Sequence, residues 1–137
     1  MKGKLHVYTG NGKGKTTAAL GLALRSVGAK KKVFIGQFVK GMHYGELDAI
    51  QHFKDQIVLK QYGRDCFIFQ EPVKEDIDAA RHGLAEITEI LKSNKYQLIV
   101  LDEANIAIHY NLFTVNELIE ALDQRNPDLE VVVTGRY

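Results

Sequence analysis

Stretches of apolar, β-branched and aromatic residues alternate along this chain with stretches that have helical spacing, and this alternation constrains the fold more than any other feature. Five of the apolar stretches are predicted to be strands: Leu5–Tyr8, Val33–Val39, Ile57–Tyr62, Gln97–Leu101 and Val131–Thr134. Several are continuously apolar, as is typical of strands covered on both faces. Between the strands, helices are predicted at Thr16–Val27, Glu46–Phe53, Lys74–Ser93 and from Thr114 onward.

Two of the helical stretches carry particularly clear signals. Within 74–93, apolar residues recur in steps of three and four and therefore share one side of a helix: Ile77, Ala80, Leu84, Ile87 and Leu91. Thr114 and Glu117 have the spacing of a capping box at a helix start.

Alternating strands and helices predict an α/β fold with a mainly parallel sheet and helices on both faces. Because the chain stops directly after its last strand, we expect a C-terminal part to be missing.

The composition excludes several classes of protein. A length of 137 residues suits a single domain, 1–137. A hydrophobic fraction of 45% and a charged fraction of 26% argue against a disordered or fibrous chain. No apolar run approaches the roughly 20 residues that cross a bilayer, and the N-terminus lacks the apolar core of a secretory signal. A single cysteine, Cys66, excludes an intrachain disulfide. These features predict a soluble cytoplasmic protein without a membrane partner.

Charge is distributed unevenly along the chain. Residues 1–45 contain nine basic side chains and no acidic one, whereas the remaining 92 residues contain nine basic and all 17 acidic side chains. A basic first third indicates an anionic partner, although Lys30–Lys32 taken alone fits a solvated turn better. Nucleic acid is not expected as that partner, because the glycines among these lysines suit a small polyphosphate.

A loop rich in glycine and lysine joins the first predicted strand to the first predicted helix. Glycines let the backbone curl around phosphate oxygens, so that its N–H groups and the following helix N-terminus point at the anion. Lys15 would neutralise phosphate charge and Thr16 would offer its hydroxyl to Mg²⁺. Thr9 departs from the pattern G-x-x-x-x-G-K-[ST], but the strand–loop–helix setting still predicts a nucleotide triphosphate site. The residues expected to bind are Thr9, Gly10, Asn11, Gly12, Lys13, Gly14, Lys15, Thr16 and Thr17.

Other candidate site residues lie at strand ends or in a loop. Asp102 and Glu103 follow the buried strand 97–101, where they would hold Mg²⁺ beside the phosphate loop; alone, such a pair would more often cap a helix. Phe67 and Phe69 could face a flat hydrophobic ligand, but local sequence favours ordinary core positions. Arg136 follows the last strand and could contact phosphate or ribose, or be a surface arginine.

Four motifs together resemble those of the ATP:corrinoid (cob(I)alamin) adenosyltransferases, in the branch with a P-loop NTPase (RecA-like) fold. They are residues 10–17 (GNGKGKTT), 37–41 (QFVKG), 100–103 (VLDE) and 133–136 (VTGR). The motifs are spread over the whole chain in order. The first is the most specific, because the loop to which it belongs also has the non-glycine start, Thr9.

This resemblance implies an enzyme of cobalamin biosynthesis that transfers the 5′-deoxyadenosyl group of ATP to the Co(I) of a reduced corrinoid and releases triphosphate. Lys13 and Lys15 would be catalytic, because they stabilise charge that accumulates on the triphosphate. Thr16 and Glu103 would contact Mg²⁺, with Asp102 close by. Phe67 and Phe69 would lie against the lower face of the corrin.

The resemblance further implies a homodimer, and a reductant protein such as a flavodoxin is a candidate partner. Many relatives have an N-terminal arm over the site and a segment after the VTGR motif that have no counterpart here. The residues themselves leave two alternatives: an ATPase or kinase that uses the same loop, and a regulatory module that binds ATP without chemistry.

Overall fold

A five-stranded sheet organises the fold. The computed structural model describes residues 3–9, 14–39, 45–63 and 72–135. The strands are β1 (Leu5–Thr9), β2 (Val33–Phe38), β3 (Ile57–Tyr62), β4 (Leu98–Asp102) and β5 (Glu130–Gly135). They lie in the order β1-β5-β4-β2-β3, and all four pairings are parallel. The predicted α/β class is therefore confirmed, and the predicted strand boundaries agree within one residue.

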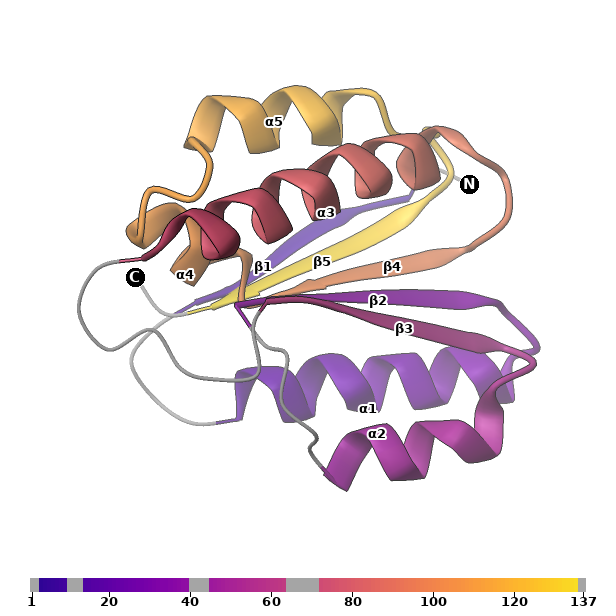
Figure 1. Cartoon of the computed structure of the whole chain (residues 1–137). Helices are drawn as coiled ribbons and strands as arrows, with labels where there is room; N and C mark the ends of the chain where they lie inside the picture. The colour runs from indigo at the N-terminus through magenta and orange to yellow at the C-terminus, as the bar shows by residue number, and fades with distance from the viewer. Residues whose placement is uncertain (1–2, 10–13, 40–44, 64–71, 136–137) are drawn as a thin grey trace.

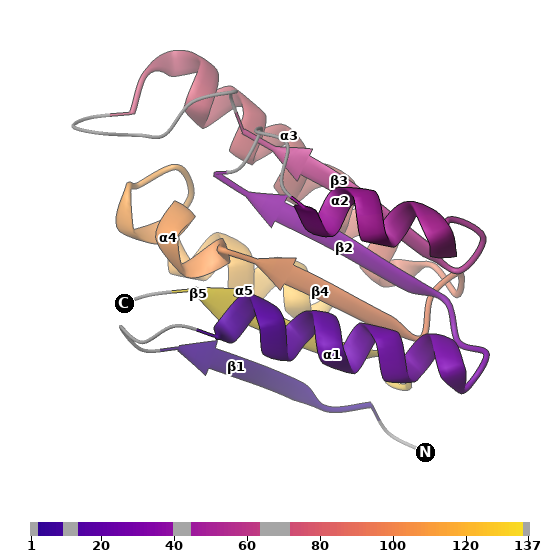
Figure 2. The same cartoon turned by 90° about the horizontal axis from the view of Figure 1, so that it is seen from below.

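Helices cover both faces of this sheet (Figure 1, and from below in Figure 2). On one face lie α1 (Lys15–Gly28), α2 (Gly45–Ile50) and a single 3-10 turn, η1 (Gln51–Phe53). On the other face lie α3 (Lys74–Lys92), α4 (Ala104–His109) and α5 (Val115–Asp123). Neighbouring side chains of a strand point to opposite faces of the sheet. Phe34 therefore lies in the hydrophobic core between the sheet and α3, and Ile35 lies in the core between the sheet and α1. Every residue of β2 is buried, as its mainly apolar sequence predicts.

Two helical segments differ from the sequence prediction. The predicted helix 46–53 is divided into α2 and η1, and α4 was not predicted. With only six residues, α4 is too short to show a helical repeat of apolar positions. No helix in the described part of the chain has the length and apolar character needed to span a membrane.

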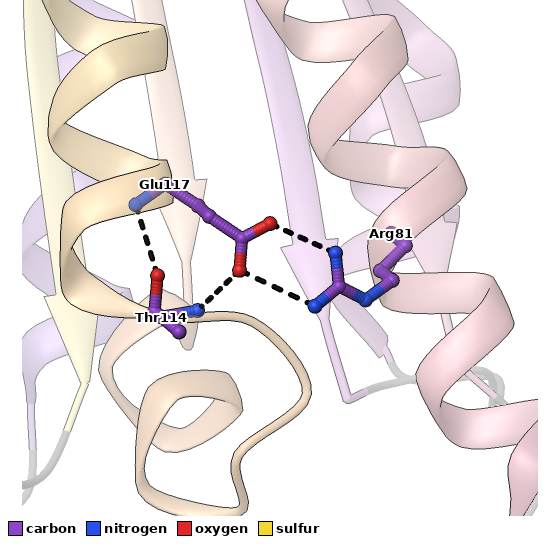
Figure 3. A network of polar contacts seen from close by, with 3 residues as sticks. All are labelled: Arg81, Thr114 and Glu117. Atoms are coloured by element: carbon purple, nitrogen blue, oxygen red, sulfur yellow. Dashed lines mark hydrogen bonds and ion pairs between the residues drawn. The ribbon is translucent and has the colours of Figure 1, made fainter.

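The predicted capping box at the start of α5 is confirmed (Figure 3). The Glu117 backbone N–H donates to Thr114 Oγ1 at 3.1 Å, and the Thr114 backbone N–H donates to Glu117 Oε1 at 3.0 Å. Arg81 of α3 donates to both Glu117 oxygens, at 2.8 and 3.3 Å. The Thr114 N–H, and then Arg81, hold the pKa of the Glu117 carboxyl below its usual value. The cap therefore also links α5 to α3.

Replacing the capping threonine tests the cap. We expect Thr114→Ala to lower the free energy of unfolding by about 1 kcal/mol, because one backbone N–H of α5 loses its acceptor. Thr114→Ser, which keeps the hydroxyl, should retain most of the wild-type stability. Urea unfolding followed by circular dichroism measures both, and equal losses in the two variants would contradict a role for the hydroxyl.

The ring of Tyr62 occupies the space beside a glycine of α3. A Cβ atom at Gly83 would lie 2.4 Å from Tyr62 Cγ, so α3 approaches β3 more closely than any side chain at 83 would allow. The Tyr62 hydroxyl donates to Glu86 Oε1 at 3.0 Å, which fixes the ring in this position. Burial, and then the hydrogen bond to Glu86, raises the pKa of Tyr62 well above its usual value.

Two glycine-to-alanine changes on helices should therefore have opposite effects. Gly83→Ala should destabilise the protein by about 1–3 kcal/mol, because the new methyl group overlaps the Tyr62 ring. Gly21→Ala in α1, where no heavy atom lies within 4 Å of the new Cβ, should stabilise it by roughly 0.5–1 kcal/mol through helix propensity. Urea unfolding measures both changes, and a shift of the same sign would show that the packing at Gly83 does not decide the outcome.

Candidate functional site

Polar side chains that are almost fully buried gather where the central strands end. Gln37 of β2 and Thr134 of β5 are 0% exposed, and Asp102 of β4 is 1% exposed. Because all strands are parallel, their carboxyl ends meet at one edge of the sheet, and α1 begins at that same edge (Figure 2). Crevices at this edge are the usual ligand sites of open α/β sheets.

Asp102 is the centre of the polar group. Its Oδ1 accepts hydrogen bonds from the hydroxyls of Thr16 at 2.8 Å and Thr134 at 2.6 Å. Its Oδ2 accepts a hydrogen bond from the Gln37 amide at 3.3 Å. The carboxylate thus connects β4 with α1, β5 and β2. Thr16 and Asp102 are 86 residues apart in the sequence. Thr16 and Asp102, which the sequence predicts to lie near Mg²⁺, are directly hydrogen-bonded to each other.

The start of α1 has a backbone conformation compatible with the end of a phosphate loop. Gly14 has a φ of 101°, a left-handed value that favours glycine, and it occupies the N-cap position of α1. Lys15 and Thr16 then form the first turn, whose backbone N–H groups are the natural donors for an anion. The neighbouring carbonyl of Gly14 is used within the helix, since it accepts from the Ala18 N–H at 2.8 Å.

Glu103, the residue after β4, has a left-handed backbone conformation. Its φ is 62°, and it is the N-cap residue of α4. Its backbone N–H donates to Thr134 Oγ1 at 3.1 Å, so Thr134 receives one hydrogen bond and gives one to Asp102. Glu103 of the acidic pair thus begins a helix, and Asp102 is hydrogen-bonded to Thr16, while the binding of Mg²⁺ by the pair stays a prediction.

Asn105, on α4, joins the carboxyl ends of β1 and β5. Its side-chain amide donates to Thr9 Oγ1 at 3.4 Å and to the Gly135 carbonyl at 3.5 Å. A Cβ at Gly135, where φ is 151°, would lie 2.7 Å from Asn105 Cβ. The contact holds the end of β1, where the loop begins, against the end of β5.

Sequence reasoning placed Gln37 and Thr134 within two of the family motifs, but named neither of them, nor Asn105, as a site residue. The signal for the first two was a polar residue near the end of a mainly apolar strand. Asn105 gave no comparable signal, since it lies on the helix that was not predicted. Seven predicted site residues lie outside the described part of the chain: Gly10, Asn11, Gly12, Lys13, Phe67, Phe69 and Arg136.

The oxygen atoms around Asp102 suit a hard cation. Mg²⁺ prefers oxygen ligands, and in nucleotide sites it is held by one or two protein groups together with phosphates. The Thr16 hydroxyl and the carboxylates of Asp102 and Glu103 are of this kind. Within the described ranges, no group of three or more His, Cys, Asp or Glu side chains has the geometry to hold a metal ion.

Comparison with known sequences identifies the family. All of residues 1–137 match the family described as "ATP:corrinoid adenosyltransferase BtuR/CobO/CobP". The chain belongs to this adenosyltransferase family. It is 34% identical over 137 residues to a corrinoid adenosyltransferase of Escherichia coli K12, with 98% of this chain and 68% of the relative covered.

Further relatives agree. A corrinoid adenosyltransferase CobA of Salmonella typhimurium is 34% identical over 141 residues, with 98% and 68% covered. A corrinoid adenosyltransferase of a Sinorhizobium species is 32% identical over 138 residues, with 98% and 64% covered. The family resemblance predicted from the four motifs is thereby confirmed, and with it the assignment to the transferases that use ATP and a corrinoid.

Proposed function

We propose that this adenosyltransferase moves the 5′-deoxyadenosyl group of ATP to the Co(I) centre of a reduced corrinoid, with inorganic triphosphate as the leaving group. The observation that carries the proposal is the Thr16–Asp102 hydrogen bond of 2.8 Å beside the left-handed Gly14. It places a hydroxyl and a carboxylate at the start of α1, where a nucleotide triphosphate would bind.

The reaction needs little acid–base chemistry from the protein. The electron pair of Co(I) forms the cobalt–carbon bond, the C5′–O bond breaks, and its electron pair leaves with the triphosphate. No hydroxyl has to be deprotonated, so the protein has to position the two reactants and stabilise charge on the leaving group. Lys13, Lys15 and the backbone N–H groups of residues 9–17 are suited to this role.

The donor set supports Mg²⁺ as a companion of ATP. Thr16 would hold the ion together with Glu103 and Asp102, and the bound ion would supply positive charge against the triphosphate. The Thr16 hydroxyl gives its hydrogen to Asp102, which leaves its lone pairs for a cation. This orientation is the one that a hydroxyl ligand requires.

The corrinoid side of the site is proposed from the family resemblance. Phe67 and Phe69 would lie against the lower face of the corrin, and Arg136 would contact phosphate or ribose. A cytoplasmic homodimer that receives electrons from a protein such as a flavodoxin completes the proposal.

Identifying the phosphorus-containing product tests the reaction. With ATP, Mg²⁺ and chemically reduced cobalamin under anaerobic conditions, we expect triphosphate together with the absorption spectrum of a cobalt–carbon bond. ADP and phosphate in place of triphosphate would indicate an ATPase or kinase. Binding of ATP with neither product, in a protein that contains all segments found in the relatives, would favour a regulatory module.

The contribution of the loop lysine can be measured separately. Lys15→Ala should lower kcat/KM about 10- to 100-fold, because each lost charge-assisted bond to the leaving triphosphate contributes ~1.5–3 kcal/mol. Lys31→Ala, an exposed lysine at the opposite edge of the sheet, serves as the matched control and should stay within about twofold of wild type. Equal activities of the two variants would remove Lys15 from the mechanism.

A further inference from the structure

Gln37 is a fully buried amide in a strand whose other residues are apolar or glycine. The strand β2 reads VFIGQF, and Gln37 is 0% exposed. Burying an amide is unfavourable unless its N–H and C=O groups find partners, so a buried glutamine in a central strand calls for an explanation in terms of those partners.

The nitrogen and the oxygen of the Gln37 side-chain amide are both hydrogen-bonded, and the partners fix which way the amide faces. The register places Gln37 opposite Asp102 on one side and opposite Gln61 on the other. Its Nε2 donates to Asp102 Oδ2 at 3.3 Å, and its Oε1 accepts from Gln61 Nε2 at 3.2 Å. A carboxylate accepts hydrogen bonds, so the Gln37 amide has to turn its nitrogen toward Asp102 and its oxygen toward Gln61.

This bond determines how the two oxygens of Asp102 are used. The Gln37 amide holds Oδ2, while Oδ1 takes the hydroxyl hydrogens of Thr16 and Thr134. Rotation of the carboxylate about its Cβ–Cγ bond would break the contact with Gln37. The amide therefore fixes the carboxylate plane, and with it the direction in which the Thr16 hydroxyl points its hydrogen.

We propose that Gln37 is a positioning residue for the divalent cation that accompanies ATP, and that it acts through Asp102 on the Thr16 hydroxyl. This inference rests on the proposed function. Gln37 holds Asp102 so that Thr16 keeps its lone pairs available to the cation. Residues that orient metal ligands in this way typically change metal affinity 10- to 100-fold when they are replaced.

Isothermal titration calorimetry with ATP, in excess EDTA and in excess Mg²⁺, tests the inference on the intact chain. The quantity of interest is the factor by which Mg²⁺ tightens ATP binding. In Gln37→Met, which keeps the length of the side chain and removes the amide, we expect this factor to fall about tenfold. ATP affinity in EDTA should stay within about twofold of wild type.

Gln61→Met is the matched control. It removes the hydrogen bond from Gln61 to Gln37 and leaves the hydrogen bond from Gln37 to Asp102 in place. The factor by which Mg²⁺ tightens ATP binding should therefore change less than threefold. If Gln37→Met lacks a native near-ultraviolet circular dichroism spectrum, Gln37→Asn carries the same expectation, because its side chain is too short to reach Asp102.

The outcomes separate this inference from the function on which it rests. An unchanged Mg²⁺ factor in a folded Gln37 variant would overturn the inference and leave the proposed function intact. Equal losses of affinity in EDTA and in Mg²⁺ would also overturn it, since they would reveal a purely structural role. A wild-type protein in which Mg²⁺ does not tighten ATP binding would refute the proposed cation site and this inference with it.

Discussion

The buried carboxylate of Asp102 is the interaction on which the architecture of the site depends. Asp102 is 1% exposed, and it is acceptable in the interior because three donors from three different elements converge on it. The same convergence fixes the start of α1 relative to β4, β5 and β2. One group therefore serves both the fold and the proposed site: the hydrogen bonds that make the buried carboxylate tolerable also hold the Thr16 hydroxyl at the start of α1, the region proposed to bind the nucleotide.

The topology explains why this convergence is possible. β5 lies between β1 and β4, so Thr134 reaches Asp102 from the neighbouring strand, and β2 borders β4 on its other side. The parallel arrangement brings all these carboxyl ends to one edge without any of the residues being close in sequence. The family to which the chain belongs is named for ATP and a corrinoid, and ligands of open α/β sheets usually bind at this carboxyl edge.

Most of the fold, and part of the site, could be predicted from the sequence. The strands were predictable because buried parallel strands are continuous apolar runs, and α3 and α5 because their apolar stripe and capping box are local signals. The proximity of Thr16 and Asp102 followed from the setting of the loop and of the buried strand, and their role toward Mg²⁺ stays a prediction. The six-residue α4 could not be predicted because it is too short to show a helical repeat. The contacts of Gln37 and Asn105 could not be predicted because they depend on which strands become neighbours. A polar residue in an apolar strand signals that a partner exists, but only the strand order reveals which one.

Backbone conformation at this edge has a consequence for how the protein can change during evolution. Val39 and Glu103, just after β2 and β4, have left-handed φ values of 64° and 62°, which are unusual for residues with side chains and especially so for a β-branched one. Such conformations cost on the order of 1–3 kcal/mol each and persist only where surrounding structure enforces them. The carboxyl edge of the sheet, where the candidate ligands lie, therefore contains two unfavourable backbone conformations that the surrounding structure maintains. A substitution that stabilises the protein by relaxing the backbone at Glu103 would therefore also move the residue that directly follows Asp102.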